Sequence, residues 1–321
     1  MKILYTADIH IKLGQKDVPV PWAKNRFAMF CEQFADMQKQ VNLVIVGGDI
    51  FDRLPTMDEL ELYFDFVASI KKPCIIYSGN HEAIKKGTTF LTFVKKATNR
   101  LNPLVRIVDD YEYLADYDMD IIPYNKLKDF VDNYSTLDFH GKYLCTHVRG
   151  EIPPHVKPEI PLELLDRWET VLAGDLHSYS NSQRNILYPG SPYTTSFHRS
   201  TTETGAILFE TSDGSHKWLR FNLPQLIKRT IKAGEVPVPT DFDHTMYEVE
   251  GDISDLSTID DSELISKKVV KRSSDTSLIL DPKLSMAEEL REYLTFILEL
   301  SEDNISDALQ VFLEHQNKIQ E

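Results

Sequence analysis

The chain has few cysteines, no long apolar run and no excess of positive charge. Its three cysteines, Cys31, Cys74 and Cys145, are far apart and form no CxxC pair. A disulfide framework and a structural zinc site are therefore not expected, whereas reduced and buried thiols are. No apolar run approaches the roughly 20 residues of a membrane span. No signal-like segment follows Met1, so we expect no secretory signal.

Two common catalytic motifs are also missing. The sequence contains no GxxxxGK[ST] phosphate-binding loop, so any ATP hydrolysis must come from another protein. It contains no nucleophile elbow, so a Ser-His-Asp or Cys-His hydrolase is a poor fit.

Acidic residues outnumber basic ones, 50 to 35, which gives a net charge of −15. The excess is uneven, because residues 285–321 hold nine acidic and two basic residues, a net charge of −7. Proteins that grip nucleic acid unaided are usually basic. The charge argues against tight unaided DNA binding, but it does not exclude DNA as a substrate.

Strand-like and helix-like segments alternate along the first 180 residues, which predicts an α/β core. The apolar patterns predict strands at 2–7, 42–47, 73–78, 104–108, 119–123, 142–145 and 170–173. They predict helices at 22–40, about 56–70 and 86–99, and Thr56 with Glu59 reads as a capping box for the second.

The pattern of apolar and polar residues changes after Gly190. Residues 205–211, 217–222 and 226–232 alternate like antiparallel strands. Residues 242–250, 253–259 and 264–271 suggest a compact β-α-β unit, and two helices are expected from Met286 onward. We therefore predict a core at 1–224, a small second domain at 225–282 and a helical region at 283–321.

Five short blocks of metal-binding residue types follow predicted strands. They are Asp8-Ile9-His10, Gly48-Asp49, Gly79-Asn80-His81-Glu82, Thr146-His147 and Gly174-Asp175-Leu176-His177. Ligands of α/β sheets bind at the carboxyl ends of the strands, so we expect the blocks to meet at one edge of a sheet. Carboxylate, amide and imidazole ligands together suit Mn, Fe or Zn. Two such ions about 3.5–4 Å apart can polarise a phosphate ester and activate water.

Each block has a plainer explanation when it stands alone. Asp8 and Asp49 could cap turns, His147 could be an ordinary strand-end histidine, and Asn80 could occupy a left-handed turn. Five strand ends that all carry ligand types are improbable as turn chemistry. The coincidence favours a site for two metal ions and hydrolysis of a phosphate ester.

The order DxH, GGDIFDR, GNHE, strand-end His and GDLH resembles the calcineurin-like metallophosphoesterase superfamily. Within it, 49–53 (DIFDR) and 188–192 (YPGSP) make the chain most similar to the SbcD-type nucleases of DNA repair and recombination. The resemblance implies a four-layer β-sandwich core flanked by helices, a small α+β capping domain, and C-terminal helices that dock on an SbcC-like coiled-coil ATPase. It also implies a homodimer of the core.

The resemblance also implies roles for individual residues. One metal ion would be held by Asp8, His10, Asp49 and His177. The other would be held by Asp49, Asn80, His147 and Asp175, with Asp49 bridging the two. His10 and Asp49 would thereby be essential for catalysis, and His81 would contact the scissile phosphate or protonate the leaving oxygen. Manganese is the expected metal, with magnesium as the alternative.

The sequence departs from the family pattern at two places. Asp175 stands where the family usually has histidine, so a third carboxylate would face the ions and favour Mn or Mg over softer metals. Glu82 stands where the nucleases commonly have aspartate and is typical of the protein phosphatase branch. That branch usually has glycine at the positions of Ile11 and Leu54, which argues against it here.

Basic residues near the blocks fit a polyanionic substrate, although each could be an ordinary solvated charge. The candidates for DNA binding are Arg53, Lys85 and Lys86 beside the blocks and Lys267, Lys268, Lys271 and Arg272 on the small domain.

The sequence thus predicts a metal-dependent DNA exonuclease subunit, with endonuclease activity left open, in the cytoplasm of a bacterium or a phage-infected host. A phosphatase or small-molecule phosphodiesterase of the same superfamily is the alternative enzyme. A non-catalytic scaffold is the alternative from another class, and Asp175 is its only support.

Overall fold

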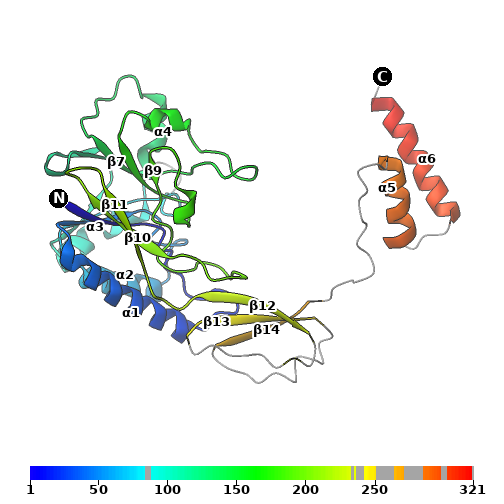
Figure 1. The fold of residues 1–321 in the computed structure, drawn as a ribbon, viewed down its shortest axis with the longest axis horizontal. Helices are drawn as coiled ribbons and strands as arrows, with labels where there is room; N and C mark the ends of the chain where they lie inside the picture. The colour runs from blue at the N-terminus through cyan, green and yellow to red at the C-terminus, as the bar shows by residue number, and fades with distance from the viewer. Residues whose placement is uncertain are drawn as a thin grey trace.

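The computed structural model describes residues 1–83, 88–232, 235, 242–250, 264–270, 285–297 and 302–319 (Figure 1). Two larger sheets and one smaller sheet account for the strands in this part of the chain. Short 3-10 helices connect several elements: Gln38–Gln40, Ala115–Tyr117, Leu162–Leu165 and Tyr179–Asn181.

The first sheet has six strands in the order β11-β10-β1-β2-β3-β4. Their bounds are β1 Lys2–Thr6, β2 Leu43–Gly47, β3 Cys74–Tyr77, β4 Val105–Val108, β10 Gly205–Glu210 and β11 His216–Arg220. Strands β1 to β4 pair in parallel, and β10 joins β1 antiparallel. The buried residues of β2 form a continuous apolar run, as expected for a strand covered on both faces.

The second sheet has five strands in the order β5-β6-β7-β8-β9. Their bounds are β5 Glu112–Leu114, β6 Met119–Ile122, β7 Tyr143–His147, β8 Thr170–Gly174 and β9 Ile186–Leu187. Strands β6 to β9 are parallel, and β5 pairs with β6 antiparallel.

The two sheets pack face to face, and helices cover their outer faces. Between the sheets, Tyr5 and Ile45 of the first meet Tyr143 and Leu172 of the second in one buried cluster. Helices α1 (Val20–Met37), α2 (Met57–Ser69) and α3 (Phe90–Leu101) pack on the other face of the first sheet. Helix α4 (Tyr124–Asp132) packs on the other face of the second. This arrangement confirms the predicted four-layer α/β core.

Helix α2 begins at the predicted capping box. The Thr56 hydroxyl accepts from the Glu59 N–H, and the Glu59 carboxylate accepts from the Thr56 N–H at 2.8 Å. Helix α3 begins at Phe90, four residues later than predicted, because Thr89 has extended backbone and caps the helix. Helix α4 was not predicted. Its nine residues are mostly polar, and only Leu127 and Phe130 are fully buried.

The third sheet consists of β12 (Leu226–Lys232), β13 (His244–Glu250) and β14 (Ile265–Val270). All three strands pair in parallel, so the antiparallel pairing expected for 226–232 is wrong. Alternation of apolar and polar residues indicates that one face of a strand is covered, but it does not indicate the direction of the neighbouring strand. The sheet lies beside the start of α1 (Figure 1), where the rings of Trp22 and His244 are 5.4 Å apart. The helical segment expected at 253–259 lies outside the described residues.

The two expected C-terminal helices are present. Helix α5 spans Met286–Glu292 and continues as a π-helical segment at Tyr293–Ile297, and α6 spans Glu302–Ile319. Ser285 forms a capping box with Glu288, and Leu294 and Ile305 are buried where the helices pack together. Among the residues that the structure describes, no helix combines the length and apolar character needed to cross a membrane. The domain boundaries stay a prediction.

Candidate metal centre

The five ligand blocks converge, but from two sheets rather than from one edge of a single sheet. Asp8, Asp49 and Asn80 follow strands β1, β2 and β3 of the first sheet. His147 ends β7, and Asp175 follows β8, in the second sheet. The ligand atoms of the blocks nevertheless come within about 4 Å of one another, so the blocks meet beyond the carboxyl ends of these strands. The convergence was predicted correctly and the single edge was wrong.

Four of the converging residues have left-handed backbone. The φ angles are 56° at Asp8, 46° at His10, 50° at Asp49 and 103° at Asp175. Aspartate tolerates this region better than most residues, but it still costs conformational energy, and such strain concentrates at functional sites. At these positions the chain leaves the strand direction, and the side chains gather beyond the strand ends of the two sheets.

Gly48 allows the loops to approach closely. A Cβ at this position would lie 2.5 Å from the Gly79 nitrogen and 2.6 Å from His147 Nδ1, so no other residue fits. Its φ of 87° also favours glycine. The Asp8 N–H donates to the Gly48 carbonyl at 3.1 Å, which ties the first two loops together.

The first cluster consists of Asp8, His10 and His177, whose ligand atoms lie within 4.8 Å of one another. The two histidine Nε2 atoms are 3.0 Å apart, and His177 Nε2 is 4.0 Å from Asp8 Oδ1. Burial raises the pKa of Asp8 well above its usual range, and the carboxylates of Asp49 and Asp175 add to this. Burial also lowers the pKa values of His10 and His177.

The second cluster surrounds the carboxylate of Asp49. His147 Nε2 lies 3.5 Å from Asp49 Oδ2 and 3.0 Å from Asn80 Oδ1. His147 Nδ1 donates to the Gly47 carbonyl at 2.8 Å, which fixes the ring and turns Nε2 toward the site. Asp175 Oδ1 is 4.0 Å from the same nitrogen. Asp49 Oδ2 is also 3.6 Å from His10 Nε2, so this carboxylate lies between the two clusters.

The donor set fits divalent cations. When His147 is neutral, its Nε2 beside Asn80 Oδ1 is an acceptor, so the amide oxygen faces only acceptor atoms, and protein partners would satisfy it only with the amide reversed. A cation would satisfy the amide oxygen as it stands. Two nitrogens about 3 Å apart match neighbouring ligands about 2.1 Å from one ion. Asp8 and Asp49 are buried, and each accepts from a backbone N–H, that of Asp175 and that of His81. Within the described residues neither is paired with a lysine or an arginine, which also calls for a positive charge.

Binding of a cation here should release protons. Burial lowers the pKa of His147, but the carboxylates of Asp49 and Asp8 outweigh it and raise that pKa to about 9. Since only neutral imidazole binds a metal, manganese affinity should rise with pH up to about 9. Titration calorimetry at pH 7.5 in buffers of different ionisation enthalpy should show release of at least about one proton per protein. Heats that do not depend on the buffer would contradict this charge state.

Glu82, the second departure from the family pattern, holds two of the ligand-bearing loops together. Its carboxylate accepts from the N–H groups of Asp49 (3.0 Å), Phe51 (2.8 Å) and Gly79 (2.8 Å). It is buried, and burial together with the nearby Asp49 carboxylate raises its pKa to about 7. The side chain therefore joins the second and third loops, and this local role explains an acid here without recourse to a phosphatase branch.

Replacing Glu82 with glutamine should destabilise the metal-free protein by about 1–3 kcal/mol. The three N–H groups need both carboxylate oxygens, whereas an amide has one oxygen and its NH2 group cannot accept a hydrogen bond. Thermal unfolding in chelator measures the loss. Glu169→Gln is the control, because Glu169 is 65% exposed and pairs with Lys142 at the surface, and less than about 0.5 kcal/mol is expected. Equal stabilities for the two variants would refute this role of Glu82.

His81 lies at the rim of the same site. Its Nδ1 donates to the Asp52 carbonyl at 2.6 Å, which directs Nε2 toward Asp49 Oδ2 at 3.8 Å. Its side chain is 37% exposed, so a substrate can reach it. A half-exposed imidazole in a fixed orientation can exchange a proton with a bound phosphate ester.

The structure describes only some of the predicted DNA-binding residues. Arg53 Nη2 donates to Glu59 at 2.9 Å and to the Leu13 carbonyl at 3.2 Å, so its guanidinium is already engaged in joining the first two loops. Lys267 and Lys268 lie on β14. Lys85, Lys86, Lys271 and Arg272 lie outside the described residues. The DNA-binding role of this set stays a prediction.

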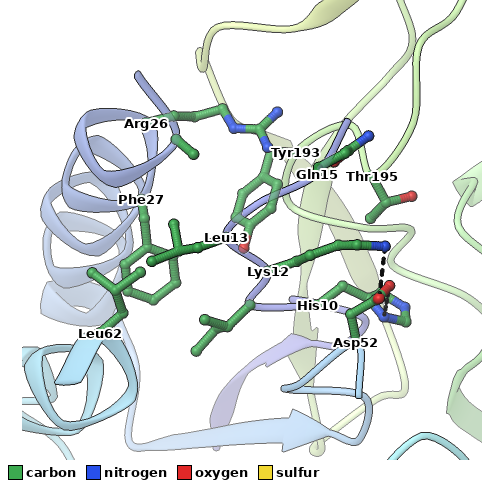
Figure 2. Close-up of a pocket in the computed structure, with 12 residues that line it drawn as sticks. His10, Lys12, Leu13, Gln15, Arg26, Phe27, Asp52, Leu62, Tyr193 and Thr195 are labelled. Carbon is green, nitrogen blue, oxygen red and sulfur yellow. Dashed lines mark ion pairs between the residues drawn. The ribbon is translucent and has the colours of Figure 1, made fainter. Parts of the chain in front are cut away.

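Sequence reasoning missed two cations beside the centre. Lys12, two residues after His10, pairs with Asp52 at 2.7 Å in the pocket beside His10 (Figure 2). Arg149, two residues after His147, binds the Asp175 carboxylate through two nitrogens. Arg149 could have been found by strand alternation from His147 at the end of β7, because residues two apart on an extended chain point to the same side. Lys12 could not, because His10 has left-handed backbone.

Comparison with known proteins identifies the family. Residues 1–188 match the family model described as calcineurin-like phosphoesterase, and the chain belongs to this family. It is 40% identical to "Probable exonuclease subunit 1" of Escherichia phage T5, over 96% of this chain and 97% of the relative. It is 24% identical to "Putative phosphoesterase 244L" of Invertebrate iridescent virus 6, over 88% and 90%.

Among solved structures, the crystal structure of TT1561 of Thermus thermophilus is 9% identical, with a TM-score of 0.41. The match covers 68% of this chain and 98% of that one.

Proposed function

We propose that the protein is the nuclease subunit of a DNA-processing complex and cleaves DNA as a metal-dependent exonuclease. The observation that carries this is the convergence of seven ligand-type side chains from two facing sheets. One ion would be held by Asp8, His10, Asp49 and His177, and the other by Asp49, Asn80, His147 and Asp175. Bound there, two ions supply polarisation of the phosphate and activation of water. Manganese is the proposed metal.

The protein's own side chains orient the reaction. Asp49, almost fully buried between the clusters, would bridge the two ions. His81 Nε2 faces the same carboxylate and is reachable by substrate, which suits it to protonate the leaving oxygen. Lys12 adds a positive charge beside His10 that a DNA phosphate could reach, although it is paired with Asp52. The T5 relative's name, an exonuclease subunit, supports nucleic acid as the substrate class.

Substrate preference tests the proposal. Purified protein with manganese would be offered linear duplex DNA, a phosphoprotein and bis-p-nitrophenyl phosphate, each with and without chelator. The proposal predicts chelator-sensitive cleavage of DNA ends and of the diester, with little phosphoprotein turnover. Preferential phosphoprotein hydrolysis would instead identify a phosphatase. No bound metal and no turnover would identify a scaffold.

We also propose that α5 and α6 dock on an SbcC-like coiled-coil ATPase. The helices pack on each other yet leave Tyr293, Val311 and Leu313 exposed by 41%, 56% and 45%. Exposed apolar side chains on an acidic helical pair suit a groove with basic rims. The T5 relative is named a subunit, which supports a partner. The homodimer of the core stays a prediction.

Replacing both Val311 and Leu313 with glutamate in the full chain should abolish co-purification with the ATPase and leave manganese-dependent hydrolysis of bis-p-nitrophenyl phosphate unchanged. Buried charge without a partner disrupts an apolar interface strongly. Leu104→Glu is the matched control, because Leu104 is also 45% exposed but lies in the core domain. Retained association of the double variant would refute this docking surface.

A further inference from the structure

Arg149 and Asp175 form a bidentate ion pair at the metal centre. Arg149 Nε donates to Asp175 Oδ2 at 3.1 Å, and Nη2 donates to Oδ1 at 3.2 Å. The Asp175 side chain is 6% exposed, whereas that of Arg149 is 44% exposed. The carboxylate therefore faces inward, 4.0 Å from His147 Nε2, and the guanidinium lies at the solvent side of the same site.

The pair gives the Asp175 position a balanced charge. A carboxylate in place of an imidazole adds a negative charge beside Asp8 and Asp49, which are both buried. The Asp175 N–H already donates to the Asp8 carboxylate at 3.0 Å, so these groups are in direct contact. The guanidinium cancels the added charge, and the pair as a whole is as neutral as the histidine that the family usually has at this position.

The guanidinium retains donors for another group. A guanidinium has five N–H donors, and the Asp175 contacts use one each from Nε and Nη2. The nearby Glu159 carboxylate accepts instead from the Tyr124 hydroxyl at 2.5 Å, and its backbone N–H donates to the Arg149 carbonyl. Arg149 thus has N–H groups at the solvent side of a centre built for a phosphate ester, where fork-shaped donors match phosphate oxygens.

We propose that Arg149, held in place by Asp175, is a substrate-binding residue that takes a non-bridging oxygen of the scissile phosphate. Asp175 then has two tasks, because it anchors Arg149 and also faces the ion beside His147. This inference rests on the proposed metal-dependent phosphodiesterase function and adds a contact to it.

Two binding measurements test the proposal without relying on turnover. Titration calorimetry would give the affinity for manganese and, on the manganese-loaded protein, the affinity for inorganic phosphate. The variants are Arg149→Ala, Asp175→His and the two combined. Arg106→Ala is the matched control, since Arg106 is also 44% exposed and pairs with a carboxylate, that of Glu112, away from the site.

Arg149→Ala should bind phosphate about 10- to 100-fold more weakly, the value of a charge-assisted hydrogen bond, without weaker manganese binding. Asp175→His should bind manganese about tenfold more weakly, because the unpaired guanidinium then faces the ions. Combining the two changes should restore manganese affinity and leave phosphate affinity low. Such opposite, non-additive effects are the signature of a coupled pair. Added guanidinium ion should return part of the phosphate affinity to Arg149→Ala.

The proposal is overturned if Arg149→Ala binds phosphate as the parent does, or if the effects on manganese binding simply add. Because Arg149 is largely at the surface, the single alanine variant decides the question even if Asp175→His unfolds. Failure of the proposed function looks different, since the parent protein itself would then bind no manganese or would hydrolyse the phosphoprotein in preference to DNA and the diester.

Discussion

Replacing Asp49 with asparagine is expected to lower DNA cleavage by about a thousandfold or more and to remove at least one bound manganese ion. Asp49 Oδ2 is within 3.8 Å of three imidazole nitrogens, those of His10, His81 and His147. In the described part of the chain, no other carboxylate lies this close to all three. Loss of a bridging carboxylate disturbs both ions together, and a thousandfold loss corresponds to about 4 kcal/mol of the barrier. Steady-state cleavage and manganese content measure the two effects.

The control for this variant is Asp120→Asn. Asp120 is also buried, and it accepts from the Gly141 N–H at 2.9 Å and from Trp168 Nε1 at 2.8 Å, outside the metal centre. Its replacement should lower the melting temperature and spare manganese binding. If Asp49→Asn cut DNA as fast as the parent while Asp120→Asn behaved as expected, the bridging role would be wrong.

Replacing His81 with asparagine should slow DNA cleavage by about 10²- to 10⁴-fold, the usual contribution of a general acid. Hydrolysis of bis-p-nitrophenyl phosphate should change far less, because p-nitrophenolate is a weak base and leaves without a proton. Manganese binding should persist. The ratio of the two rates, measured for parent and variant, isolates the proton transfer from other losses.

His140→Asn provides the comparison for His81. The His140 side chain is 55% exposed and lies near Asp138, away from the converging blocks, so neither rate should change. An equal loss on both substrates would argue against proton transfer by His81. Loss of manganese from His81→Asn would instead make it a metal ligand, as its position beside His10 and Asp49 also permits.

The fold could be predicted where local chemistry decides the structure. The buried run of β2 and the capping box at Thr56 are visible in the sequence, and both formed as expected. Helix α4 was missed because it is only nine residues long, although its buried residues Leu127 and Phe130 have helical spacing. The predicted antiparallel pairing of β12 was wrong because the direction is set by the partner strand β13, and the residue pattern of β12 does not show which strand that is.

The sequence predicted which ligand-type residues would come together, but it did not predict which other residues hold them in place. Aspartate and histidine at five strand ends together indicate ligand chemistry, although each block alone has a plainer explanation. The roles of Glu82 and Arg149 depend on partners that only the fold brings near, namely three backbone N–H groups and the Asp175 carboxylate. Arg53 shows the converse, since a cation that looks free in the sequence is paired with Glu59.

Anomalous diffraction from a manganese-soaked crystal tests the central claim most directly. The account predicts two peaks about 3.5–4 Å apart, with Asp49 touching both, one beside His10 and His177 and the other beside His147. Absence of any peak at Asp49, or a single ion bound elsewhere on the surface, would contradict it.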